Sequence, residues 1–159
     1  MRIAIDVDGG DHGAAVTLPA VASFLSTRPE AQVVLVGLES SLALIDKHIP
    51  AAVATRVSRV VATEVVGMDE SPALALKNKK NSTLRLALDA VKHGDANACV
   101  SAGNTGALMA TARFVLKTLP GIDRPAIASI MPAPGGNGGA RHGDGGSIML
   151  DLGANVDCT

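Results

Sequence analysis

Short apolar runs alternate with helix-type patterns along this chain, and that alternation limits its possible folds more than any other feature. Runs with strand character lie at 2–7, 32–36, 57–62, 98–101, 126–131 and 147–151. Helical patterns separate most of them, at 14–26, 40–47, 82–93 and 105–117, with a further short helix that begins at Ser71-Pro72. Nearly continuous apolar strands are typical of a parallel sheet covered on both faces. We therefore expect a Rossmann-like, three-layer α/β/α fold with a mostly parallel sheet.

The composition excludes several classes of function. The 159 residues include no Trp, no Tyr and only two Phe, so the chain lacks the aromatic platforms on which nucleic-acid bases stack. The formal net charge of -1 is too balanced for a general nucleic-acid binder. Cys99 and Cys158 cannot form a disulfide framework, and no apolar run is long enough to span a bilayer. We expect a cytoplasmic protein that binds no nucleic acid and contacts membranes only peripherally.

Polar residues gather where strands of the expected sheet end, which is where ligands bind in folds of this class. The first cluster follows the strand at 2–7. Gly9 and Gly10 let the backbone turn sharply and approach a ligand, while Asp6, Asp8, Asp11 and His12 supply acid-base or hydrogen-bonding groups. The alternative is a turn that only caps and starts the next helix.

The second cluster links the strand at 98–101 to the helix at 105–117. Free amides in a first helical turn and the positive end of the helix dipole favour an anion, such as phosphate or a developing oxyanion. Ordinary helix capping by Asn104 or Thr105 is the alternative. The candidate anion-binding residues are Ser101, Gly103, Asn104, Thr105 and Gly106.

Two further groups are candidates for binding. Asn155 and Asp157 follow the strand at 147–151 and could orient a substrate. A cationic group near the helix at 82–93 could neutralise phosphate or dock an acidic protein, although such runs are often only a solvated face. This group contains Lys77, Lys79, Lys80 and Arg85.

Other features of the sequence do not indicate a metal site, a reactive thiol or a phosphate-binding motif. The four histidines lack metal-ligand spacing, so we expect no metal site, and Cys99 within an apolar strand is expected to be an inert thiol. The segment 132–146 has seven glycines in fifteen residues, but their spacing fits no phosphate-binding motif. We expect a flexible surface loop or a β-hairpin excursion there.

Several motifs, in this order, resemble those of the PlsX family of phosphate acyltransferases. Asp6-Val7-Asp8-Gly9-Gly10-Asp11-His12 is similar to the opening motif of that family, and Met68-Asp69-Glu70-Ser71-Pro72 and Lys79-Lys80-Asn81-Ser82-Thr83 follow it. The most specific block is 98–109, with Ser101-Ala102-Gly103-Asn104-Thr105-Gly106 at its centre; the segments 118–126 and 151–158 also match. The chain departs from the family at Asp8, where Met is usual, and in the longer segment 132–146.

The resemblance implies a fold like that of isocitrate and isopropylmalate dehydrogenases. It also implies that chains of this family are about twice as long, so that residues 1–159 form the N-terminal part of a single domain and are inactive in isolation. The implied reaction converts acyl-ACP and inorganic phosphate to acyl phosphate and free acyl carrier protein, feeds phospholipid synthesis and needs no cofactor. A homodimer and peripheral membrane contact through the remaining half are further implications.

The resemblance also suggests roles for individual residues. Asn104 and Lys80 are the expected catalytic residues, and Thr105 and the amides of Gly103 to Gly106 bind phosphate or the oxyanion. The polar side chains of the first and third clusters shape the floor of the cleft. Two rival functions stay open: a phosphate acetyltransferase-like enzyme that uses acyl-CoA, and a non-catalytic scaffold that binds acyl carrier protein.

Overall fold

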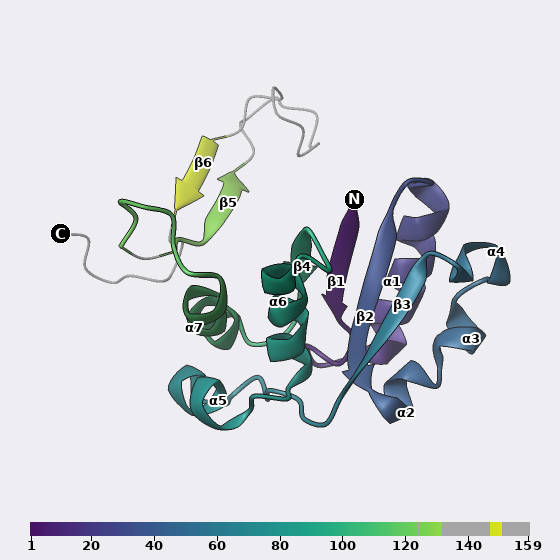
Figure 1. Cartoon of the computed structure of the whole chain (residues 1–159), viewed down its shortest axis with the longest axis horizontal. Coiled ribbons are helices and arrows are strands. Elements are labelled where there is room, and N and C mark those ends of the chain that lie inside the picture. Colours follow the sequence, from purple (N-terminus) through teal and green to yellow (C-terminus); the bar gives the residue numbers. More distant parts are fainter. Residues whose placement is uncertain (124, 132–146, 151–159) are drawn as a thin grey trace. The chain divides into compact units, whose positions relative to one another are not determined.

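The computed structural model describes residues 1–123, 125–131 and 147–150. The chain divides into two compact units, Met1–Lys117 and Thr118–Thr159. The first unit contains a parallel four-stranded sheet in the order β3-β2-β1-β4 (Figure 1), which confirms the expected fold class. Its strands are β1 (Arg2–Asp6), β2 (Gln32–Leu38), β3 (Val57–Ala62) and β4 (Ala98–Val100).

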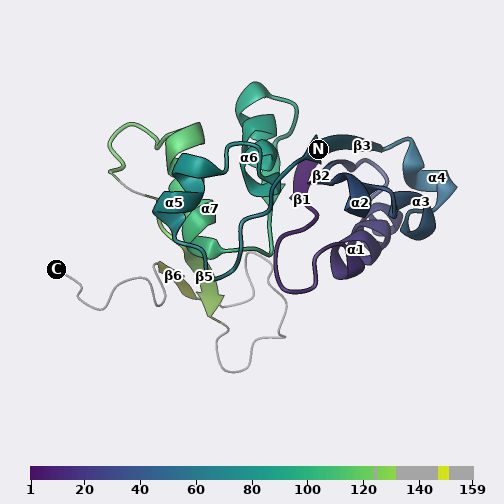
Figure 2. The ribbon, with the colours of Figure 1, turned by 90° about the horizontal axis from the view of Figure 1, so that it is seen from below.

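Two layers of helices cover this sheet because its apolar residues alternate between the faces. On one face, Val33 and Leu35 pack with Leu18 and Leu25 of α1 (Ala14–Thr27). On the other face, alanines and valines of β1 and β2 pack against α6 (Thr83–His93). Figure 2 shows the sheet between α1 and α6. On the side of α6, α7 (Thr105–Leu116) contacts both α6 and α5 (Pro72–Asn78).

The ends of α6 and α7 follow local chemistry. The Ser82 hydroxyl accepts a hydrogen bond from the Arg85 amide at 3.3 Å, and Gly94 ends α6 with a left-handed φ of 84°. The predicted pair between Arg85 and Asp89 on α6 is confirmed, at 3.0 Å. Asn104 caps α7 in the same way as Ser82 caps α6.

The helix predicted at 40–47 is wrong as a single element. The structure instead has α2 (Glu39–Leu42) and α3 (Ile45–His48), which are separated where the Leu44 amide bonds the Ser41 carbonyl in a tighter turn. A third short helix, α4 (Ala51–Ala54), was not predicted. Pro50 precedes it, and a proline ring cannot continue α3.

The second unit is described only in part. Its strands β5 (Ala128–Met131) and β6 (Ser147–Leu150) pair antiparallel in a separate two-stranded sheet. Residues 132–146, for which a flexible surface loop or a β-hairpin excursion was expected, lie outside the described residues. The prediction that 1–159 belongs to one domain stays a prediction.

Candidate functional site

The strand order creates a switch point between β1 and β4. From β1 the chain passes through α1 to β2 and β3 on one side, and then returns through α6 to place β4 on the other side of β1. Loops that leave the carboxyl ends of two such strands diverge to opposite faces and leave a crevice where ligands bind. The first two polar clusters of the sequence follow β1 and β4, so the structure brings them together at this edge.

Glycines allow the two loops to pack directly on each other. A Cβ at Gly9 would lie 2.6 Å from Asp6 Oδ2 and 2.9 Å from Ser101 Oγ. Gly10 has a φ of 85°, and a Cβ there would lie 2.8 Å from the carbonyl oxygen of Ala102. Any larger residue must therefore push the β1–α1 loop away from the β4–α7 loop.

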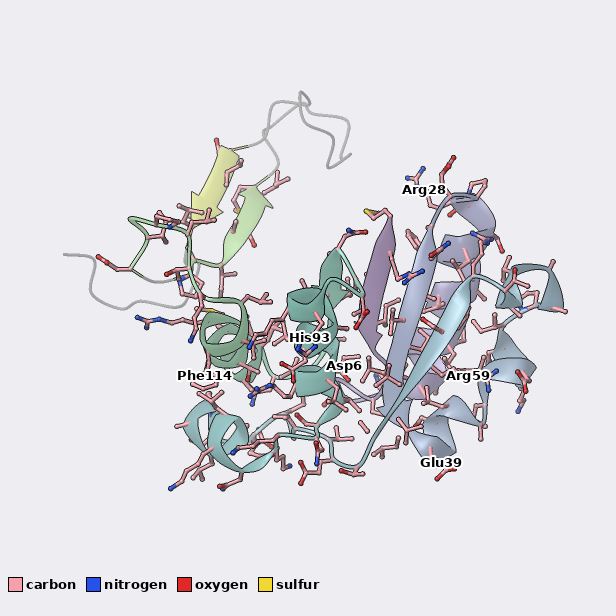
Figure 3. The ribbon with its side chains drawn as sticks, in the orientation of Figure 1. Asp6, Arg28, Glu39, Arg59, His93 and Phe114 are labelled. Carbon is pink, nitrogen blue, oxygen red and sulfur yellow. The ribbon has the colours of Figure 1, made fainter. Side chains whose placement is uncertain are left out.

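A buried carboxylate ties these loops together. Asp6, only 3% exposed, lies at the end of β1 (Figure 3) and accepts a hydrogen bond of 2.7 Å from the Ser101 hydroxyl. The same hydroxyl accepts the Gly103 amide at 3.0 Å. Burial raises the pKa of Asp6, while the nearby hydroxyls of Thr83 and Ser101 oppose that rise. Asp6 thus orients the turn before α7.

Asn104 is occupied by the protein itself. Its Oδ1 accepts the Ala107 amide at 2.9 Å, and its Nδ2 faces the carbonyl oxygens of Gly67, Met68 and Glu70 at 3.2, 2.9 and 2.9 Å. The side chain is 9% exposed. It therefore fixes the start of α7 against the loop at 65–70, while the catalytic role expected for Asn104 stays a prediction.

The first turn of α7 leaves two amides available. The Asn104 carbonyl accepts the Leu108 amide, and the Asn104 side chain accepts that of Ala107. The amides of Thr105 and Gly106 donate to no acceptor among the described residues, and both residues are exposed. Two free donors at the positive end of a helix form an anion-binding position.

Two of the four predicted docking cations are paired within the protein. Lys79 Nζ lies 2.6 Å from Glu70 Oε2 and 2.6 Å from the Val65 carbonyl oxygen, so it holds the 65–70 loop together with Asn104. Its hydrogen bond to Glu70 lowers the pKa of that carboxyl. Arg85 pairs with Asp89 and also lies over the Phe114 ring of α7 (Figure 3), at 5.7 Å from its centre.

Four further residues of the predicted site are exposed to solvent. Lys77 and Lys80 are exposed at the end of α5 and in the turn that follows it, and Asp11 and His12 are exposed in the β1–α1 loop. These four side chains are free to meet a ligand or a partner from solvent. Asn155 and Asp157 lie outside the described residues.

The sequence placed Asp8 among the hydrogen-bonding groups of the first cluster but did not predict its partners. Its carboxylate accepts the Leu38 amide at 2.7 Å and also accepts the Ser41 hydroxyl at the start of α2. Asp8 therefore anchors the β1–α1 loop to the end of β2, the strand on the other side of β1 from β4. A carboxylate followed by two glycines at a strand end, together with Ser40-Ser41 after the next strand, was the available signal.

Cys99 behaves as an inert thiol, as expected. Burial, with a smaller effect from the charge of Asp6, raises its pKa to about 12, so the thiol stays protonated at neutral pH. Within the part of the chain that the structure describes, no group of three His, Cys, Asp or Glu side chains is arranged to hold a metal ion.

The parallel sheet and its switch point define a Rossmann-like domain, and the open turn at α7 is its candidate anion-binding position. The chain belongs to the family described as "Fatty acid synthesis protein", which it matches over residues 1–159. It is 56% identical over 159 residues to a phosphate acyltransferase of Herminiimonas arsenicoxydans, covering 99% of this chain and 42% of the relative.

Two other relatives give the same pattern. A phosphate acyltransferase of Chromobacterium violaceum is 56% identical over 163 residues, which cover 100% of this chain and 44% of that protein. A phosphate acyltransferase of Paraburkholderia phytofirmans is 50% identical over 158 residues, which cover 99% of this chain and 40% of that protein. The chain thus spans about two fifths of the length of these curated relatives. Among the residues that the structure describes, no helix combines the length and apolarity that crossing a membrane requires.

Proposed function

We propose that this chain is part of an enzyme that transfers an acyl group from acyl carrier protein to inorganic phosphate. The observation that carries the proposal is the pair of free amides at Thr105 and Gly106, which follow directly on the turn that packs against the two-glycine loop after β1. Relatives named phosphate acyltransferases, more than half identical to this chain, support the reaction type.

The chemistry needs positioning more than a protein nucleophile. An oxygen of phosphate attacks the thioester carbonyl carbon, a tetrahedral oxyanion forms, and the carbon–sulfur bond then breaks as the carrier thiolate leaves and takes a proton. Helix-end amides that hold phosphate in line, or that bind the developing oxyanion, lower the barrier for this sequence. Asp6, Ser101 and Asn104 keep those amides in place, and Lys80 is the exposed cation that we assign to charge neutralisation.

The substitution Thr105→Pro tests this site, because Pro at the first helical position removes one N–H and fits the helix. The extended ψ of 110° at Asn104 suits a following proline. A hydrogen bond to a charged group contributes about 1.5–3 kcal/mol. We therefore expect kcat/KM for phosphate to fall roughly 10- to 150-fold in the full-length protein.

The matched control is Thr105→Ala, which retains the amide and removes only the side chain, and which should change the phosphate dependence little. If Thr105→Pro leaves acyl-phosphate formation and its phosphate dependence unchanged, the anion does not bind these amides. Comparing acyl carrier protein with coenzyme A as the acyl donor separates the proposed reaction from the acetyltransferase alternative. A scaffold would show no turnover with either donor.

The exposed cations Lys77 and Lys80 are the proposed contacts for the acidic carrier protein. Lys79 and Arg85 contribute to the positive potential of the same surface, although both are paired within the chain. Steering by such charges weakens as salt is raised. Homodimer formation, peripheral membrane contact and a cytoplasmic location stay predictions.

A further inference from the structure

An apolar groove of about 350 Å³ opens at the switch point between β1 and β4. It is formed between α1 and the neighbouring strands β1 and β4, on the face of the sheet opposite α6. Its volume falls within the range of small-molecule pockets. Its main side chains are Ile3 and Ile5 of β1, Val100 of β4, and Val16, Ala20 and Phe24 of α1.

One end of the groove lies at this switch point, and the groove leads away from it. Asp6 and Ala102, which belong to the two loops at the carboxyl edge, line the end near the site. From there the groove follows α1 from Val16 to Phe24, a distance of about 12 Å at the helical rise per residue. A molecule whose reacting end lies at the switch point can therefore extend into the groove.

The lining is suited to hydrocarbon. Apart from Asp6 and Thr17, every lining side chain is aliphatic or aromatic, and Val16 and Val100 are 57% and 54% exposed despite adjoining the core. A peptide segment in extended form would bring backbone amides that this lining cannot satisfy. A linear alkyl chain brings no polar group.

We infer that this groove binds the acyl chain of the donor, with the thioester carbon at the switch point and the alkyl tail along α1 toward Phe24. The inference rests on the proposed function, since it assigns the tail of the same substrate. Each buried methylene contributes about fourfold in affinity. Reactivity should therefore rise with chain length while the tail lies in the groove and level off once it extends past Phe24.

The experiment uses the full-length protein with acyl carrier protein loaded with chains from four to sixteen carbons. Ala20→Phe places a ring in the middle of the groove, and we expect kcat/KM for long chains to fall at least tenfold while four-carbon chains stay within about twofold. The control is Ala15→Phe, because Ala15 is exposed on α1 and does not line the groove. It should leave all chain lengths unchanged.

A second variant removes atoms instead of adding them, so it tests the groove without the risk that overpacking disrupts the fold. Val16→Ala trims the exposed edge of the groove and should lower kcat/KM several-fold for long chains only. Equal loss at every chain length in Ala20→Phe, together with a lower melting temperature, would mean that protein fills the groove, and the inference would be wrong. Unchanged length preference in both variants would also overturn it. Absence of turnover with every donor would instead refute the proposed function.

Discussion

Gly10→Ala is the sharpest test of how closely the two loops at the site pack. Gly10 and Gly94 have almost the same left-handed φ, 85° and 84°. A Cβ at Gly10 would lie 2.8 Å from the Ala102 carbonyl oxygen, whereas a Cβ at Gly94 would meet nothing within 4 Å. Both substitutions therefore force an alanine into the left-handed conformation, and only Gly10→Ala adds a steric contact.

The shared cost is that of the left-handed conformation for an L-residue, about 1–2 kcal/mol. The contact at Gly10 adds an overpacking cost of about 1–3 kcal/mol, because a backbone oxygen cannot move aside as a side chain can. We expect Gly10→Ala to lower the free energy of unfolding by about 3 kcal/mol and Gly94→Ala by about 1 kcal/mol. Against a typical domain stability of about 5–15 kcal/mol, this difference is easily measured.

Urea unfolding followed by circular dichroism at 222 nm is the suitable assay, since the chain has no Trp or Tyr for fluorescence. All the helices that the structure describes lie in the unit Met1–Lys117, so this signal reports on that unit. Equal losses in the two variants would show that the β1–α1 and β4–α7 loops are not in contact in solution, and the close packing at the site would then be incorrect.

Two further predictions concern side chains that hold the site. Asn104→Ala should lower the free energy of unfolding by about 2–3 kcal/mol, because the cap of α7 and the hydrogen bonds to the 65–70 loop are both lost. Asn104→Ser should lower it by about 1 kcal/mol less, because the serine hydroxyl still caps the helix. Equal losses for the two variants in urea unfolding would contradict the capping role. Burial raises the pKa of Asp6, so the native protein binds this proton more tightly than the unfolded protein does. The stability that Asp6 contributes is therefore present at low pH and is lost as the pH rises from the unfolded pKa through the folded pKa. Asp6→Asn should remove this loss of stability with rising pH. If the difference in urea midpoint between the variant and the wild type stays the same across this pH range, the prediction is wrong.

The sheet was predictable from sequence because its strands are short, apolar and separated by helices. The strand at 57–62 was predicted to the residue, and those at 2–7 and 98–101 each differ by one residue at the end. The stretch from 39 to 54 was not predictable in the same way. Its apolar residues Leu42, Ile45, Ile49 and Val53 follow a helical spacing, but the tight turn at Leu44 and the ring of Pro50 divide it into three short helices.

The candidate site was predictable in its position but not in the role of each side chain. Polar clusters after β1 and β4 indicated the edge, because parallel strands bring their carboxyl ends together. Sequence could not reveal that the 65–70 loop folds over Asn104 and occupies its amide, since those contacts join residues more than thirty positions apart. The pair between Lys79 and Glu70 joins residues only nine positions apart, but it too depends on the path of the 65–70 loop, which the sequence did not predict.

The protonated thiol of Cys99 offers a built-in reporter on the edge of the sheet. Cys99 pairs with Ala4 in the register between β4 and β1, and its ionisation is suppressed while it stays beneath α6. In a variant with Cys158→Ser, the rate of alkylation at neutral pH would report the transient openings between α6 and these two strands. A ligand that joins the loops above them should slow that rate, which would allow binding to be followed without any optical label.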